Sequence, residues 1–240
     1  MTVLALLHSP LTSADAWGQL PAVLGEHGWR VVVPSVNDDD TPPYAQRYVA
    51  RAASQLHASL DVDQEATAGE PLVLVGHSGA GPLLAQVAFA RRAAGHPAHG
   101  YLFLDAGLPR PTNARNRLDL MRIEDPDFAP TLQAHLAAGE RFPDWASDDL
   151  AEEIPNPGDR ALLLAGLRPR GLDYFTEELP LAEDWPDAPV AYLQLSAPYD
   201  QPAATARRRG WATRSLGLGH FAAISHPQAV AQAMTELLRG

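Results

Sequence analysis

Short apolar runs alternate with longer amphipathic stretches along the first hundred or so positions of the chain. The runs are nearly continuous, which is typical of strands buried on both faces of a parallel sheet. The predicted strands are Val3–Leu7, Arg30–Val33, Leu72–Val75 and Tyr101–Leu104. Between them, apolar positions recur at helical spacing over residues 15–26, 44–60 and 83–94, with Asp15 expected to cap the first helix and a polar connection expected over residues 61–70. This alternation predicts an α/β fold with a mostly parallel, doubly wound sheet.

The alternation stops after the predicted strand that ends at Asp105. Residues 108–188 contain no clear strand and are too long for a simple loop, and we expect short helices there. The expected helices are Ala114–Arg122, Thr131–Ala138, Asp148–Ile154 and Gly158–Leu167. The span also carries aromatic residues that need burial, namely Phe128, Phe142, Trp145, Tyr174, Phe175 and Trp185. We therefore predict a helical cap over residues 108–188, inserted into a core formed by residues 1–107 and 189–240.

The sheet pattern resumes at Val190. Two further strands are expected, Val190–Leu195 and Trp211–Leu216, with helices over residues 203–209 and 227–238. No internal repeat and no low-complexity segment interrupts this organisation.

Composition narrows the classes of partner. The 240 residues carry a formal net charge of -11, which disfavours nucleic-acid binding. The absence of cysteine excludes disulfides and cysteine nucleophiles, and suits a reducing compartment. No run approaches the length of a membrane span, and Val3–Leu7 is too short and lacks the preceding positive charge of a signal peptide. We expect a cytoplasmic monomer or homodimer without membrane contact.

The stretch that carries chemistry is Gly76-His77-Ser78-Gly79-Ala80. It joins a buried strand to an Ala-rich helix, the context in which a strained turn lifts a serine hydroxyl clear of the backbone. Small residues two before and two after the serine allow strand and helix to pass closely. The alternative is an ordinary serine in a Gly-rich turn.

A serine nucleophile needs a base, and the base needs an orienting carboxylate. Asp200 and His220 each follow a predicted strand at the same edge of the sheet as Ser78, in the chain order Ser, Asp, His. We favour Asp200 over Asp105, the alternative acid at the end of the preceding strand, and His220 over His226 as the base.

At four places the sequence resembles an α/β-hydrolase. They are residues 8–17, residues 76–80, Ala197-Pro198-Tyr199-Asp200, and Gly219-His220 followed by His226-Pro227. The resemblance implies Ser78 as nucleophile, His220 as general base and acid, and Asp200 as the residue that orients it. It also implies that the cap influences substrate choice.

The predicted oxyanion site departs from the family pattern. One donor is expected to be the N–H of Gly79, at the start of a helix. The second family donor falls on Pro10, which has no N–H, so Leu11 is the expected replacement. His8 lies beside this site and is expected to anchor the loop.

These observations predict a serine hydrolase that cleaves a carboxylic ester, thioester or lactone of a small, largely apolar molecule. The residues expected to contact substrate are His8, Pro10, His77, Phe142, Trp145, Tyr199 and Phe221. Two alternatives remain open: proton transfer of the lyase or cyclase type in the same site, and a small-molecule receptor on the same scaffold. No cofactor motif is found, and His96 and His99 lack the further ligands that a metal would need.

Overall fold

A computed structural model of the chain describes residues 1–37, 39–61, 70–110 and 113–240. A parallel sheet of six strands forms its centre, in the order β2-β1-β3-β4-β5-β6. The strands are β1 (Val3–Leu7), β2 (Arg30–Val32), β3 (Leu72–Ser78), β4 (Gly100–Ala106), β5 (Val190–Gln194) and β6 (Ala212–Ser215). The predicted α/β class with a parallel sheet is confirmed.

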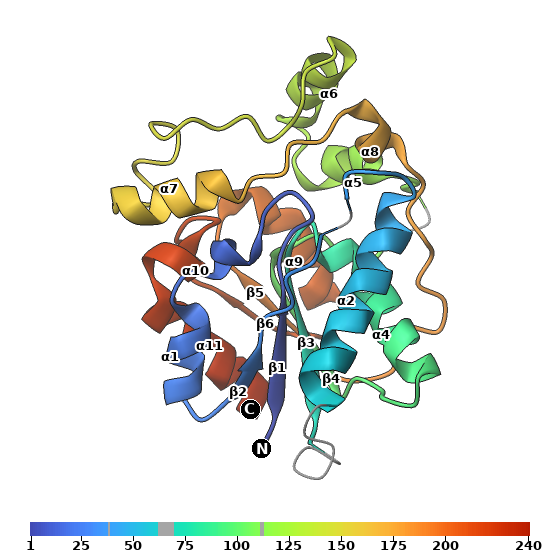
Figure 1. The fold of residues 1–240 in the computed structure, drawn as a ribbon, viewed down its shortest axis with the longest axis vertical. Helices are drawn as coiled ribbons and strands as arrows, with labels where there is room; N and C mark the ends of the chain where they lie inside the picture. The colour runs from blue at the N-terminus through green and yellow to red at the C-terminus, as the bar shows by residue number, and fades with distance from the viewer. Residues whose placement is uncertain (38, 62–69, 111–112) are drawn as a thin grey trace.

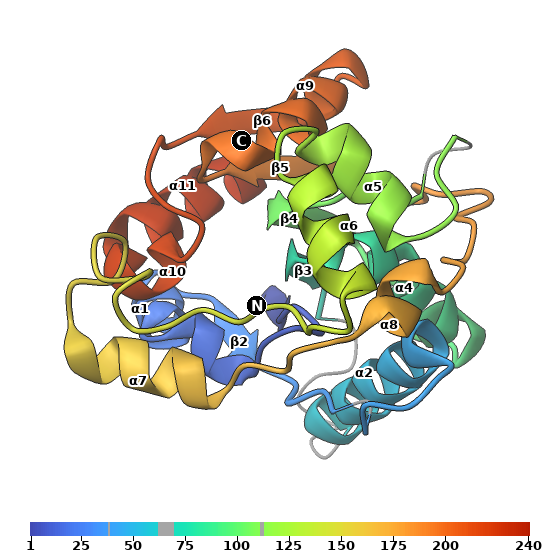
Figure 2. The same cartoon turned by 90° about the horizontal axis from the view of Figure 1, so that it is seen from above.

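Helices cover both faces of this sheet (Figures 1 and 2). One face carries α1 (Leu20–Glu26), α10 (Ala222–Ser225) and α11 (Pro227–Arg239). The other carries α2 (Tyr44–Asp61), α4 (Leu84–Ala93) and α9 (Asp200–Arg208). Short 3₁₀ turns occupy η1 (Ala14–Trp17), η2 (Gly81–Leu83) and η3 (Ala197–Tyr199).

Each face of the sheet has its own apolar core because alternate strand residues point to opposite sides. Ala5, Leu74 and Phe103 pack with α2, α4 and α9, while Leu4, Val75 and Leu102 pack with α1 and α11. Most of these side chains are completely buried. Burial on both faces explains why the central strands appear in the sequence as continuous apolar runs.

Four helices fill the segment between β4 and β5, which we call the inserted segment. They are α5 (Arg117–Glu124), α6 (Ala129–Ala137), α7 (Pro157–Ala165) and α8 (Leu172–Thr176). They lie beyond the carboxyl ends of the strands, at the opposite end of the molecule from the N-terminus (Figure 1). The view from above shows them arranged around that edge of the sheet (Figure 2).

Several predicted boundaries differ from the structure. The helix expected from Asp15 is divided into η1 and α1, and Ser13 caps η1 by accepting the N–H of Asp15. Residues 147–153 form turns where the helix Asp148–Ile154 was expected, and α8 was not predicted. Most of the polar connection predicted over residues 61–70 lies outside the described residues.

Candidate active site

Ser78 is the last residue of β3. Its backbone φ of 55° lies in the left-handed region, which residues other than glycine rarely adopt. The turn depends on close backbone approach. A Cβ atom at Gly81 would lie 2.0 Å from the carbonyl oxygen of Gly107, and one at Gly76 would lie 3.3 Å from Leu84 Cδ1. Glycine is therefore required at Gly81, a position that the sequence pattern did not single out. The turn leaves Ser78 partly exposed.

Asp105 and His220 meet next to this turn. Asp105 Oδ2 lies 2.8 Å from His220 Nδ1, and the Asp105 carboxylate is completely buried. It also accepts the N–H groups of Leu195 (2.7 Å) and Ser196 (3.0 Å) and the Ser196 hydroxyl (2.6 Å). These contacts fix the carboxylate, and the carboxylate in turn fixes the orientation of the imidazole. Asp105 itself has a φ of 44°, which Asp tolerates better than most residues.

The expectation that Asp200 orients His220 is contradicted by this geometry. Asp200 is exposed at the start of α9, and its side chain accepts a hydrogen bond from Gln194 Nε2. The turn η3 separates Asp200 from the end of β5. Asp105, in contrast, lies at the carboxyl end of β4, the strand paired with β3. The alternative acid, Asp105, is the residue that contacts His220.

The His220 ring is stacked between two other rings. His77 lies on one side with a centroid separation of 4.5 Å, and Tyr199 is nearly parallel to His220 at 5.1 Å. The Tyr199 hydroxyl lies 3.3 Å from Ser78 Oγ. Burial lowers the pKa of His77 to about 3, so its ring is neutral, and its Nε2 donates to the His220 carbonyl at 3.0 Å. The ring stack limits the orientations that the candidate base can take.

The loop after β1 contains the residues expected to complete the oxyanion site. His8 is fully buried and anchors this loop: Nδ1 donates to the Ser9 carbonyl (2.8 Å), while Nε2 accepts the Val36 N–H (3.1 Å). Burial lowers the pKa of His8 to about 4. His8 and Pro10 do not line the pocket described below, so the expectation that they contact substrate is not supported by the structure.

The two expected oxyanion donors both lie close to the Ser9 hydroxyl. The Leu11 N–H donates to Ser9 Oγ at 3.2 Å, and a Cβ atom at Gly79 would lie 3.0 Å from the same oxygen. Ser9, Leu11 and Gly79 all line the pocket. Ser9 Oγ therefore accepts the Leu11 N–H, the group that was predicted to bind the oxyanion.

A pocket of about 260 Å³ opens between the sheet edge and the inserted segment. Ser78 and His220 line it together with most of the predicted substrate contacts: His77, Phe142, Trp145, Tyr199 and Phe221. Phe128, Tyr174 and Phe175 extend the aromatic wall, whereas Trp185 is partly buried against Tyr101 and Trp211. Sequence reasoning missed Arg117 and Glu124, which also line the pocket and which no motif distinguishes from surface charges.

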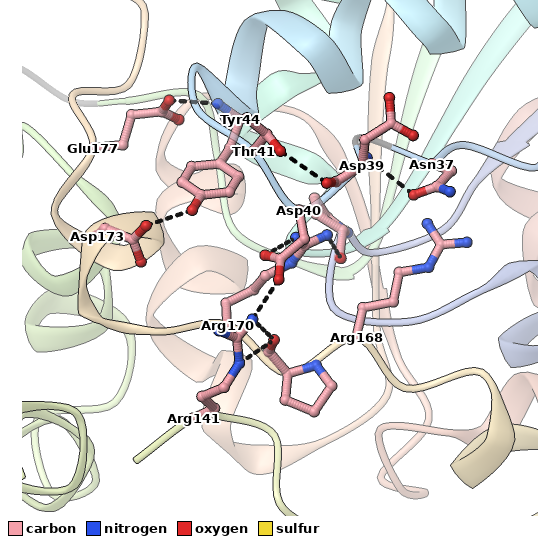
Figure 3. A network of polar contacts seen from close by, with 12 residues as sticks. Asn37, Asp39, Asp40, Thr41, Tyr44, Arg141, Arg168, Arg170, Asp173 and Glu177 are labelled. Atoms are coloured by element: carbon pink, nitrogen blue, oxygen red, sulfur yellow. Dashed lines mark hydrogen bonds and ion pairs between the residues drawn. The ribbon is translucent and has the colours of Figure 1, made fainter. Parts of the chain in front are cut away.

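The inserted segment is tied to the loop before α2 by the polar network in Figure 3. Arg141 and Arg170 both pair with Asp40, the former at 2.6 Å. Tyr44 donates its hydroxyl to Asp173 at 2.5 Å and its N–H to Glu177 at 2.5 Å. Arg170 is almost completely buried, so this network is part of the packed structure.

The inserted segment also bonds to the backbone of both loops that flank the pocket. The Arg168 N–H donates to the Leu11 carbonyl at 2.8 Å, and Arg170 Nη2 donates to the Pro10 carbonyl at 3.4 Å. On the other side, Glu153 accepts the N–H of Phe221, the residue after His220. A Cβ atom at Gly219 would lie 2.4 Å from Glu153 Oε1, so a larger residue there would displace the Glu153 side chain.

Within the described ranges, no group of three or more His, Asp or Glu side chains is placed to hold a metal ion. Within the same residues, none of the helices has both the length and the apolarity required to cross a bilayer.

Comparison with known proteins assigns the chain to a family. The family model described as alpha/beta hydrolase family matches residues 4–233 of the sequence. The chain therefore belongs to the alpha/beta hydrolase family. No curated protein sequence matches it.

Solved structures share the fold at low sequence identity. An extracellular alpha/beta-hydrolase from a Paenibacillus species has a TM-score of 0.73 and 16% identity, with 100% of each chain covered. Polyneuridine aldehyde esterase has a TM-score of 0.69 and 16% identity, covering 99% of each chain. Tomato methylketone synthase I, complexed with 2-tridecanone, has a TM-score of 0.67 and 16% identity, covering 99% of this chain and 97% of its own. The names of these neighbours include a hydrolase, an esterase and a synthase.

Proposed function

We propose that this protein is a serine hydrolase that cleaves a carboxylic ester, thioester or lactone through an acyl-enzyme on Ser78. The observation that carries the proposal is the 2.8 Å contact between the buried Asp105 and His220, which lines the same pocket as Ser78. A buried carboxylate on Nδ1 leaves Nε2 as the basic nitrogen of the imidazole. Asp105 takes the role that the sequence assigned to Asp200.

In the proposed reaction, His220 Nε2 removes the proton of Ser78 Oγ as the oxygen attacks the ester carbonyl. The tetrahedral intermediate collapses when His220 returns that proton to the departing alcohol or thiol. Water then loses a proton to His220 and attacks the acyl-enzyme, which releases the acid and restores Ser78. Asp105 stays ionised and stabilises the imidazolium in both halves.

The negative charge of the intermediate needs donors that are already in place. We propose the Gly79 N–H as one donor and Leu11 as the source of the second. Because Ser9 Oγ accepts the Leu11 N–H, the Ser9 hydroxyl proton is available to point into the pocket. Leu11 can thus act through Ser9, or directly after the Ser9 side chain rotates.

We propose that residues 108–188 form a cap over this site. The aromatic side chains that they contribute, Phe128, Phe142 and Trp145 among them, favour an apolar acyl or alcohol group. The remaining residues, 1–107 and 189–240, form the hydrolase core.

A fluorophosphonate probe tests the nucleophile. We expect stoichiometric labelling of the wild-type chain, no labelling of Ser78→Ala, and strongly slowed labelling of His220→Ala. Ser225→Ala, which alters a partly exposed α10 serine outside the pocket, is a matched control and retains labelling. Equal labelling of wild-type and Ser78→Ala protein would refute the proposal.

The hydrogen bond from Leu11 to Ser9 favours one alternative. If the Leu11 N–H stays bonded to Ser9 Oγ, the oxyanion loses a donor worth about 3 kcal/mol of transition-state stabilisation. In that case Ser78 and His220 would catalyse proton transfer instead of hydrolysis. Methylketone synthase I shows that proteins of this fold include enzymes named for a ketone product. Turnover in heavy-oxygen water distinguishes the two: hydrolysis places one labelled oxygen in the acid product, and proton transfer places none.

A further inference from the structure

The pocket contains a carboxyl group that the proposed ester chemistry does not use. Glu124 is the last residue of α5, and its partly buried side chain lines the pocket with Ser78 and Tyr199. Gly107 makes room for it, because a Cβ atom at Gly107 would lie 2.5 Å from Glu124 Oε1. Within the described residues, no hydrogen bond or ion pair joins the Glu124 carboxyl to another group. The side chain therefore does not hold two parts of the fold together.

The surroundings of Glu124 are aromatic and carry an excess of negative potential. Phe128, Phe142 and Trp145 line the same pocket as Glu124, and so does Asp125. The carbonyl end of α5 adds partial negative charge at this point. Burial raises the pKa of Tyr199 most, followed by the charge of Asp105, and Glu124 and Asp125 raise it further. This acidic pair is therefore electrostatically close to Tyr199.

The other charged groups that face the pocket do not neutralise Glu124. Arg117 lies two turns earlier on α5, where its guanidinium stacks on the Tyr174 ring at 3.9 Å and pairs with Glu177 at 3.4 Å. His77 is neutral, and His220 is already paired with Asp105. With no cation beside it, the Glu124 carboxyl has its pKa raised to about 8 by burial.

We propose that Glu124 recognises an ammonium group on the substrate, so that the ester cleaved here carries a basic amine on its apolar arm. A carboxylate beside aromatic rings provides both an opposite charge and cation–π attraction for a desolvated ammonium. A bound cation stabilises the ionised carboxylate, and so it would offset the effect of burial and lower the pKa of Glu124. This inference rests on the proposed function only in taking the pocket as the substrate's binding site.

The proposal carries a pH dependence with a fixed sign. With a pKa of about 8, free Glu124 is mostly protonated at neutral pH, and only its ionised form pairs with an ammonium. The apparent affinity for an ammonium should rise about tenfold between about pH 7 and about pH 9, following the ionised fraction. His220, Asp125, Arg117 and Tyr199 also face the pocket, so the dependence must be assigned by substitution.

Calorimetric titration of the wild-type chain with hexylammonium and with 1-hexanol tests the proposal without requiring turnover. We expect hexylammonium to bind at least about tenfold more tightly than the alcohol at about pH 8.5. Glu124→Gln should remove both this preference and the rise with pH, while retaining binding of 1-hexanol. Asp127→Asn, which removes an exposed charge three residues away, should behave as wild type.

Equal binding of hexylammonium to wild-type and Glu124→Gln protein would overturn the proposal, as would no preference for the ammonium over the alcohol. A preference that persists in Glu124→Gln would assign recognition to another group and would also overturn it. These outcomes are separate from fluorophosphonate labelling of Ser78, so failure of the amine subsite and failure of the hydrolase mechanism are distinguishable.

Discussion

Asp105 Oδ2 lies 2.8 Å from His220 Nδ1, and the same oxygen accepts the Ser196 hydroxyl at 2.6 Å. One buried oxygen thus joins the end of β4, the turn after β5 and the histidine loop. The Asp105 carboxylate therefore fixes the turn after β5 and the proposed catalytic base relative to each other.

The first prediction concerns this acid. Asp105→Asn should lower kcat by roughly 10³–10⁴-fold, because an amide can present an N–H to Nδ1 and favour the wrong imidazole tautomer. Asn tolerates the positive φ of Asp105, so the fold should be retained. Ester hydrolysis and circular dichroism measure the two effects.

Asp200→Asn is the matched control, since it makes the same change at the acid that does not contact His220. Its kcat should stay close to wild type. Comparable losses in the two variants would contradict the role assigned to Asp105.

The second prediction concerns Tyr199, whose hydroxyl is 3.3 Å from Ser78 Oγ and whose ring stacks on His220. Tyr199→Phe keeps the ring and removes about 1 kcal/mol of hydrogen bonding, so kcat should fall about fivefold. Tyr199→Ala also removes the stack and should lose more activity. Initial-rate measurements on one ester decide between this role and simple substrate contact, which would raise KM and leave kcat unchanged.

The third prediction concerns the tight turn after Ser78. Gly81→Ala places a Cβ atom 2.0 Å from the Gly107 carbonyl oxygen, and the clash should cost about 1–3 kcal/mol of unfolding free energy. Gly25→Ala is the matched control, because nothing lies within 4 Å of that Cβ and the site is an exposed position in α1. It should stabilise the helix by up to about 1 kcal/mol.

Thermal or urea unfolding of the two Gly→Ala variants measures the difference. A Gly81→Ala protein as stable as wild type would show that the turn can relax at no cost.

The fourth prediction is the acid sensitivity of the fold. His8 and His77 have folded-state pKa values of about 4 and about 3, below the reference value of 6.5, because burial disfavours the charged form. The unfolded chain therefore binds more protons, and stability is lost as pH falls below about 6.5 toward 4, by up to about 1.4 kcal/mol per unit for each histidine. Urea unfolding at a series of pH values between 7.5 and 4.5 measures the slope.

His8→Gln should show a shallower slope over the same range, even where its stability at neutral pH is lower. An unchanged slope would mean that His8 is not one of the groups responsible.

The parallel sheet and the serine turn were predictable because they depend on local patterns. Continuous apolar runs identify strands buried on both faces, and small residues around Ser78 identify the turn. The choice between Asp105 and Asp200 depends on how the chain leaves β5, which a 3₁₀ turn of three residues decides and which no periodicity reveals.

The pocket was predictable only in its aromatic character. Phe142 and Trp145 were expected to contact substrate and do line the pocket. Trp185 was expected only to need burial, and it packs against Phe103 of the sheet instead of the pocket. The sequence did not identify Glu124 as a pocket residue, since a lone acidic residue at the end of a short helix usually faces water. His8 was expected to anchor its loop and does so, yet it was also counted among the substrate contacts, from which its burial removes it.

The bonds from Arg168 to Leu11, from Arg170 to Pro10 and from Glu153 to Phe221 have a mechanical consequence. Through these hydrogen bonds, the inserted segment fixes the backbone of the two loops that carry the proposed oxyanion donor and base. Displacing the proposed cap would pull the loop of Pro10 and Leu11 away from Gly79 and would free the loop that carries His220. We therefore expect, under the proposed mechanism, that seating of the cap and alignment of the proposed catalytic groups occur together.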